Sequence, residues 1–291
     1  MMLEELDIAS WDAPISKQLQ QRAIESLEHG KVLIMPALPF ALKKEEQVFL
    51  SPHHVDPKRK NISFDPKLEN VGGSLCTGND LETLKGLLKR YALMSSHFLK
   101  LLFPHYVETL TLAKTSFRPT EISGRKSSVR KDDTRLHIDA FPSNPTKGKR
   151  ILRIFTNINP DGKPRVWKVG EPFEEVAKKF ACQISSPIPG SAQLLKLLKI
   201  TKDTRTSYDH YMLHMHNRMK EDNDYQRSVN QAEIQFPSGC TWIVFTDQVS
   251  HAALSGQHVL EQTFSLPTLG LQQVSTAPLK VLERCLNRSL I

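Results

Sequence analysis

Three residues of metal-binding type stand where they could act together. His137 and Asp139 are two positions apart in TRLHIDAFPSN, residues 134–144, and His251 begins the later run HAALSG. Alternate residues of a strand share a face, so a strand here would place His137 and Asp139 on one side and Ile138 on the other. Two imidazoles and one carboxylate form the facial set that binds non-haem Fe(II) and leaves positions open for a cosubstrate and dioxygen. These three residues are therefore the candidate ligands of a catalytic metal.

An ordinary strand whose polar residues face water is the alternative interpretation. The chain has 11 histidines, so a His-x-Asp tripeptide arises by chance about as often as not. The context favours the metal site, because the tripeptide lies in a predicted strand and a later histidine begins another.

An Fe(II) oxygenase that uses 2-oxoglutarate also needs a cation for the far carboxylate, and a guanidinium can hold both of its oxygens. The stretch after the second histidine, HAALSGQHVLEQTFSLP, contains no arginine. Arg153 in RILRIFTNINP and Arg118 in TSFRPTEI are the candidates, and Asn157 shares a strand face with Arg153. An arginine in an apolar strand is costly to bury without a partner. For each arginine, a structural ion pair with an acid such as Glu121 or Glu171 is the alternative.

The elements that must position these residues fall into two parts. Residues 1–110 are predicted to be helix-rich, with amphipathic helices in SKQLQQRAIESLEHGK and from Asn79 onward. Residues 111–291 carry short β-like runs separated by Pro, Gly, Asn and Asp, which predicts a sandwich or barrel with a helical insertion around 171–230. No repeat or Gly/Ser linker divides the chain, so 1–291 is expected to be a single domain.

The overall composition limits the class of protein. The chain has 291 residues, 39% of them hydrophobic, and a formal net charge of +8, which favours an anionic partner: nucleic acid, an acidic membrane surface or a small anion. The start MMLEELDIASWDAPISKQ does not resemble a signal peptide, and no window approaches the roughly 20 apolar residues of a membrane-spanning helix. The four cysteines have no CxxC spacing. We expect a cytoplasmic protein with free thiols.

Two longer runs carry a more specific signal. DDTRLHIDAFPSNPTKGKRILRIFTNINPDGKPRVWKVGEPFEEVAKKF and FTDQVSHAALSGQHVLEQTF strongly resemble the Kdo hydroxylase family, and the resemblance is densest between residues 115 and 265. Members of that family are Fe(II)- and 2-oxoglutarate-dependent dioxygenases that hydroxylate 3-deoxy-D-manno-oct-2-ulosonic acid (Kdo) at C3 in the lipopolysaccharide inner core. The resemblance implies a mainly β fold with surrounding helices, built on a double-stranded β-helix, or jelly roll.

The resemblance also assigns roles to residues. It makes His137, Asp139 and His251 the iron ligands at the catalytic centre, and it favours Arg118 and Arg153 as contacts of 2-oxoglutarate. We add Asn157, on the face of Arg153, to the predicted cosubstrate contacts. From their chemistry, the basic loop 125–135 and the helical stretch 208–218 are expected to contact the sugar.

The implied cofactors are Fe(II) and 2-oxoglutarate, with ascorbate as a reductant in vitro. The implied partner is Kdo-bearing lipid A, met by peripheral contact with the cytoplasmic face of the inner membrane, and no nucleic acid is expected. Two alternatives remain: a 2-oxoglutarate oxygenase that acts on another anionic substrate, and a jelly roll that binds sugar acids without catalysis.

Overall fold

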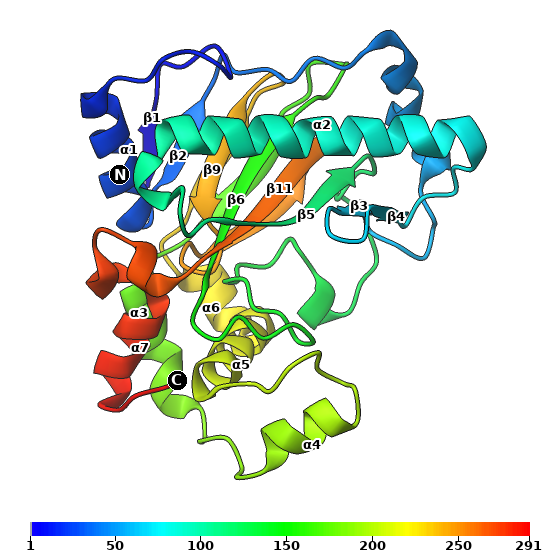
Figure 1. Ribbon diagram of the computed structural model, residues 1–291. Helices are drawn as coiled ribbons and strands as arrows, with labels where there is room; N and C mark the ends of the chain where they lie inside the picture. Colours follow the sequence, from blue (N-terminus) through cyan, green and yellow to red (C-terminus); the bar gives the residue numbers. More distant parts are fainter. Residues whose placement is uncertain (1) are drawn as a thin grey trace.

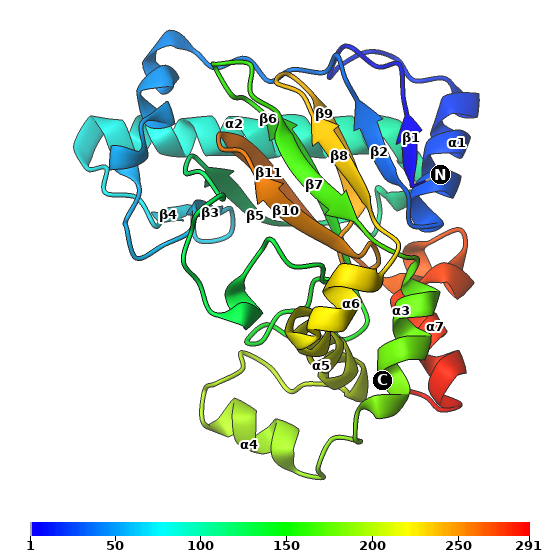
Figure 2. The same cartoon turned by 180° about the vertical axis from the view of Figure 1, so that it is seen from behind.

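Two β-sheets surrounded by helices make up the computed structural model, which describes residues 2–291 (Figure 1). The larger sheet contains, in spatial order, β1 (Leu3–Glu5), β2 (Val32–Met35), β9 (Thr241–Phe245), β6 (Arg150–Asn157), β11 (Val259–Leu266), β5 (Thr111–Arg118), β3 (Ile62–Asp65) and β4 (Asn70–Gly72). The smaller sheet contains β10 (His251–Ser255), β7 (Arg165–Val169) and β8 (Ala232–Phe236). The two sheets lie face to face, and they are the walls of the predicted double-stranded β-helix (Figure 2).

Aromatic side chains fill the space between the sheets. Trp242 of β9 stacks on Phe155 of β6, with ring centroids 5.1 Å apart, and on Phe236 of β8 at 4.1 Å. Trp167 of β7 meets Trp242 edge-on at 5.7 Å. Strand alternation explains the pattern, because the neighbouring Ile243 points to the opposite face of the larger sheet and joins a different apolar cluster. The prediction of a sandwich or barrel is confirmed.

Helices α1 (Lys17–Glu28) and α2 (Gly78–Leu102) cover the outer face of the larger sheet (Figure 1). The predicted apolar stripe of α2, which includes Leu84, Leu88 and Phe98, is buried against that face. Residues 2–110 also supply β1 to β4, which extend the larger sheet at both edges.

The chain between β7 and β8 forms most of the remaining helical structure. Its helices are α3 (Phe173–Phe180), α4 (Ser191–Leu197), α5 (Ser207–Glu221) and α6 (Asn223–Ser228). The last helix, α7 (Pro278–Leu286), packs with α3 and α5 in one apolar cluster below the sheets, whereas α4 stands apart from it (Figures 1 and 2). Within residues 2–291, none of the helices has the length and apolar content needed to cross a membrane.

One predicted strand is wrong. The run TRLHIDAF is extended around His137, but it pairs with β10 only through the single bridge between His137 and His251. On either side its backbone bonds to other partners: Leu136 N–H donates to the Gln226 side chain at 2.8 Å, and Asp139 N–H donates to Thr246 O at 2.8 Å. No second strand therefore follows the run over its length in the described chain.

Candidate metal centre

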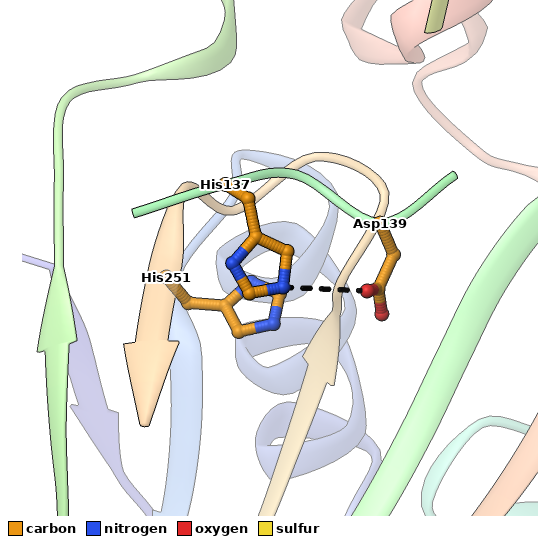
Figure 3. A group of neighbouring side chains, drawn as sticks. All are labelled: His137, Asp139 and His251. Carbon is orange, nitrogen blue, oxygen red and sulfur yellow. Dashed lines mark ion pairs between the residues drawn. The ribbon is translucent and has the colours of Figure 1, made fainter. Parts of the chain in front are cut away.

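The structure brings His137, Asp139 and His251 together at one end of the space between the sheets (Figure 3). Each offers one ligand atom, and these atoms all lie within 4.8 Å of one another. His137 Nε2 is 3.8 Å from Asp139 Oδ1. The histidines are held by the bridge between their backbones, in which each N–H donates to the other residue's carbonyl, at 3.0 and 2.9 Å. One extended segment and the first residue of β10 thus converge on a single point.

Hydrogen bonds orient the imidazoles of His137 and His251 so that Nε2 of each ring faces the point where the three residues converge. Nδ1–H of His137 donates to Arg135 O at 2.8 Å, and Nδ1–H of His251 donates to Val249 O at 2.8 Å. In each ring the proton is thereby placed on Nδ1, so Nε2 keeps its lone pair. Two neutral Nε2 atoms and a carboxylate are therefore ready to bind a cation.

Aromatic rings wall the two histidines. Trp167 stacks on His251, with ring centroids 5.1 Å apart, and His216 of α5 meets His137 edge-on at the same distance. His216 also donates from Nδ1 to Ile138 O at 2.8 Å, which anchors the backbone between the first two candidate ligands. Burial in this surrounding is the main reason why the pKa of His137 is well below its ordinary value and that of His251 is also lowered. Both rings are neutral near pH 7, as metal binding requires.

A chain of alternating charges leads from Asp139 into the barrel. Arg153 lies between two carboxylates, 3.2 Å from Asp139 Oδ2 and 3.3 Å from Glu261 Oε1. Arg118 donates from Nε and Nη2 to Glu261 Oε2 at 2.9 and 2.7 Å. Burial alone would raise the pKa of Asp139, but Arg153 and the two histidines outweigh it, so the pKa lies below its ordinary value and the group is ionised.

The alternative predicted for Arg118 and Arg153 was a structural ion pair with an acid such as Glu121 or Glu171. Both arginines do form ion pairs, but with other acids. Glu121 accepts from backbone N–H groups, among them Gly256 N at 2.6 Å, and Glu171 pairs with Lys179. The partner in the site is Glu261 of β11, which strand alternation alone could not identify from the sequence.

Arg165 is a residue of the site that sequence reasoning missed. It is 3% exposed and points between the sheets from the start of β7, on the same face as Trp167. Nη1 donates to Gly256 O at 2.8 Å, but buried Nε has no hydrogen-bond partner, and the guanidinium has no ion-pair partner within the described residues. Burial, and then repulsion from Arg118, lower its pKa to about 9. The sequence did contain an indication of this position. In PRVWKVG, Arg165 alternates with Trp167 and Val169, so a strand places its cationic side chain on the same inward face.

The remaining predicted residues lie in different surroundings. Asn157, at the far end of β6, donates to Lys163 O and Phe236 O at 3.0 Å each and accepts from Asn159 N–H at 3.0 Å. Its side chain is thus engaged by a turn, and its cosubstrate contact stays a prediction without support from this geometry. From α5, Lys220 is buried close enough to the triad to contribute to the lowered pKa values of both histidines.

The chemistry of the donor set fits a metal ion with an anionic companion. Two buried donors of the site, Arg153 Nε and Arg165 Nε, have no hydrogen-bond partner. Four cations, Arg118, Arg153, Arg165 and Lys220, surround a site whose carboxylates are Asp139, Glu261 and Asp133. Because unpaired buried charges and donors are costly, such an arrangement favours a bound anion.

The jelly roll and its facial His, Asp, His set define a mononuclear non-haem metal enzyme. Residues 10–289 match the family model of 3-deoxy-D-manno-oct-2-ulosonic acid (Kdo) hydroxylase, and the chain belongs to this family. The resemblance seen in the sequence is thereby confirmed.

Solved structures of the Kdo hydroxylase KdoO, described as a non-haem Fe(II) α-ketoglutarate-dependent dioxygenase, are 51% identical to this chain. The structure with α-ketoglutarate and Fe(III) superposes with a TM-score of 0.97 and the cobalt(II) structure with 0.98. In both cases the match covers 100% of this chain and 98% of the other. Comparison with curated proteins found no match.

Proposed function

We propose that this protein is an Fe(II)- and 2-oxoglutarate-dependent dioxygenase that hydroxylates Kdo at C3 in the lipopolysaccharide inner core. The observation that carries the proposal is the convergence of His137, Asp139 and His251 inside the jelly roll of a chain 51% identical to KdoO over its whole length. The alternatives of a non-catalytic sugar-acid binder and of another anionic substrate become outcomes of the test below.

The metal would be held by Nε2 of His137 and His251 and by the carboxylate of Asp139. Bound Fe(II) supplies the activation of dioxygen, coupled to decarboxylation of 2-oxoglutarate to succinate, by which a C–H bond becomes C–OH. Arg153 positions Asp139, because it lies 3.2 Å from Oδ2 and leaves Oδ1 directed toward His137. The two hydrogen-bonded imidazoles keep their lone pairs on this point without rotation.

The far carboxylate of 2-oxoglutarate would be held by Arg165, with Arg118 beside it. These two cations repel each other, and only Arg118 has a carboxylate partner, Glu261. An incoming carboxylate between them relieves the repulsion and gives the orphaned Nε of Arg165 an acceptor. Arg118 and Arg153 thus remain predicted cosubstrate residues, and Arg165 joins them as the cation without an acid of its own.

A basic cavity provides a route for an anionic sugar. Its volume is about 550 Å³, and it is lined by Phe141, which follows Asp139 closely in the chain, and by lysines of several elements, including Lys114, Lys149 and Lys202. Phe141 links the cavity to the candidate site, because its ring centroid lies 5.9 Å from the guanidinium of Arg153, which pairs with Asp139. Kdo carries a carboxylate and lipid A carries phosphates, and both suit this lining. We place the protein in the cytoplasm, in peripheral contact with the inner membrane, where such a glycolipid is met.

The test is incubation of the purified protein with Kdo-bearing lipid A, Fe(II), 2-oxoglutarate and ascorbate. We expect one added oxygen on the sugar by mass spectrometry, at C3 by fragmentation, together with stoichiometric succinate. His137→Ala should abolish both products and keep the fold. Normal substrate-stimulated succinate formation by His137→Ala would overturn the assignment of the triad. Succinate without sugar oxidation would indicate another substrate, and neither product from the wild type would favour a binding module.

A further inference from the structure

The segment 188–200, which contains α4 and is called the α4 segment below, exposes an unusual concentration of large apolar side chains. Ile188 is 76% exposed and Leu197 is 78% exposed. Leu194, Leu198 and Ile200 in the same segment are each more than half exposed. Isolated exposed leucines are common on protein surfaces, but five such side chains in 13 successive residues form a patch that requires a reason.

Internal packing does not supply that reason. In the part of the chain that the structure describes, none of these five residues joins a buried apolar cluster or packs against one. The segment projects from the end of the molecule formed by α5 and α6, joined by loops on both sides (Figures 1 and 2). A helix of seven residues is too short to be stable by its own propensity. The leucines of α4 are therefore available to a partner.

The charges beside the patch indicate the kind of partner. Lys196, Lys199 and Lys202 alternate with the apolar residues, and Arg205 follows. Asp203 is the single acid from 188 to 206, and its carboxylate pairs with Lys196 and Lys147. Exposed leucine and isoleucine interleaved with lysine are typical of a segment that lies in the interface of an anionic bilayer, where the apolar residues enter and the cations meet the head groups.

The residues that follow the α4 segment are tied to the loop that borders the basic cavity. Lys202 N–H donates to Ser143 O at 2.8 Å, and Arg205 donates to Pro142 O. These acceptors belong to the loop that follows Asp139, and Lys202 also lines the basic cavity. A bilayer that received the α4 segment would therefore lie next to the mouth through which a head group enters.

We propose that the α4 segment is a membrane-docking element, which inserts Leu194, Leu197 and Leu198 shallowly into an anionic phospholipid surface. The choice of a bilayer over a protein partner rests on charge complementarity and on the closeness of the segment to the cavity mouth. The biological role of membrane docking rests on the proposed function, since an enzyme needs such docking only if its substrate is anchored in the membrane. Binding to the bilayer itself needs neither metal nor turnover.

The test is sedimentation of the full chain with phosphatidylglycerol-containing vesicles and with pure phosphatidylcholine vesicles. The triple change Leu194→Ser, Leu197→Ser and Leu198→Ser should weaken binding to the anionic vesicles at least tenfold. The matched control is Leu68→Ser, Leu93→Ser and Leu269→Ser, which alters three leucines elsewhere that are at least 60% exposed and should leave binding unchanged. Lys199→Glu should weaken binding to anionic vesicles only, and added salt should reduce that difference. Circular dichroism and thermal unfolding establish that each variant is folded.

The activity of the same variants separates this proposal from the proposed function. With soluble, deacylated Kdo glycan, the triple variant should keep the wild-type rate, and with Kdo-bearing lipid A in vesicles its rate should fall along with binding. If vesicle binding is lost in the triple variant while no protein oxidises Kdo, docking stands and the proposed function fails. Equal vesicle binding by the wild type and the triple variant overturns docking. A second result would also overturn docking: the wild type binds no vesicles and is a dimer, and the triple change converts it to monomers. The patch would then be a contact between two copies of the chain.

Discussion

Replacing Arg165 by methionine should change the stability of the apo protein and its affinity for 2-oxoglutarate in opposite directions. The pKa of Arg165 is lowered from 12.5 to about 9, chiefly by burial, and at about 1.4 kcal/mol for each pH unit its buried charge costs about 5 kcal/mol. Methionine removes that cost but leaves Gly256 O without its donor at 2.8 Å, a loss of about 1.5–3 kcal/mol for a bond from a charged group. The apo protein should therefore be stabilised by about 2–3.5 kcal/mol, which raises Tm by roughly 4–10 °C.

The same change should impair the binding of 2-oxoglutarate. If Arg165 supplies the hydrogen bonds to the far carboxylate, their loss weakens binding by about 1.5–3 kcal/mol, or roughly 10–100-fold. The assay is isothermal titration calorimetry with 2-oxoglutarate and Fe(II) in the absence of oxygen, beside a thermal melt of the apo protein.

Arg150→Met is the matched control. Arg150 is fully buried but paired: Nε lies 2.7 Å from Asp247 Oδ2, and Nη2 donates to Gln248 Oε1 at 2.7 Å. Removing it leaves a buried carboxylate alone and should cost about 3–5 kcal/mol. An Arg165→Met protein that melts as early as the control, or that binds 2-oxoglutarate with unchanged affinity, would refute the assignment of Arg165 as an unpaired cation awaiting an anion.

Three further changes probe the site and its supports. Asp139→Ala should reduce metal binding, measured by equilibrium dialysis, at least 100-fold with its far-ultraviolet circular dichroism unchanged; retained metal would contradict the triad. Gly256→Ala adds a Cβ that would lie 2.9 Å from Pro164 O and 3.0 Å from Arg165 Cα at a φ of +103°, so it should destabilise the protein by about 1–3 kcal/mol and weaken 2-oxoglutarate binding by displacing Arg165. Although burial opposes it, bonding to backbone N–H groups lowers the pKa of Glu121 below 4.5, so its stabilisation is complete above pH 4.5 and is lost as pH falls through the lowered value. Because Glu121 is exposed and its charge is screened, urea unfolding should show Glu121→Gln less stable than the wild type at pH 7 by less than about 1 kcal/mol, with the two converging in acid; an equal difference at both pH values would contradict this.

Much of the candidate site was predictable because its signals are local. Histidine and aspartate two positions apart can share a side in any extended segment, so TRLHIDAFPSN gave the correct pair although it is not a regular strand. The apolar stripe of α2 and the inward-facing tryptophans follow from helical and strand periodicity. His251 was identified because a strand began with it.

The class of fold, the three metal-ligand residues and the family could all be predicted from sequence patterns. Which cation lacks an acid was decided only by the tertiary structure. Arg118, Arg153 and Arg165 all occur in β-like runs, and alternation assigns each to a face without naming the residue opposite. The fold places Glu261 of β11 between the first two and leaves the third beside Gly256 O. Ion pairing depends on distances of a few ångströms between residues far apart in the chain, and strand registers across both sheets set those distances.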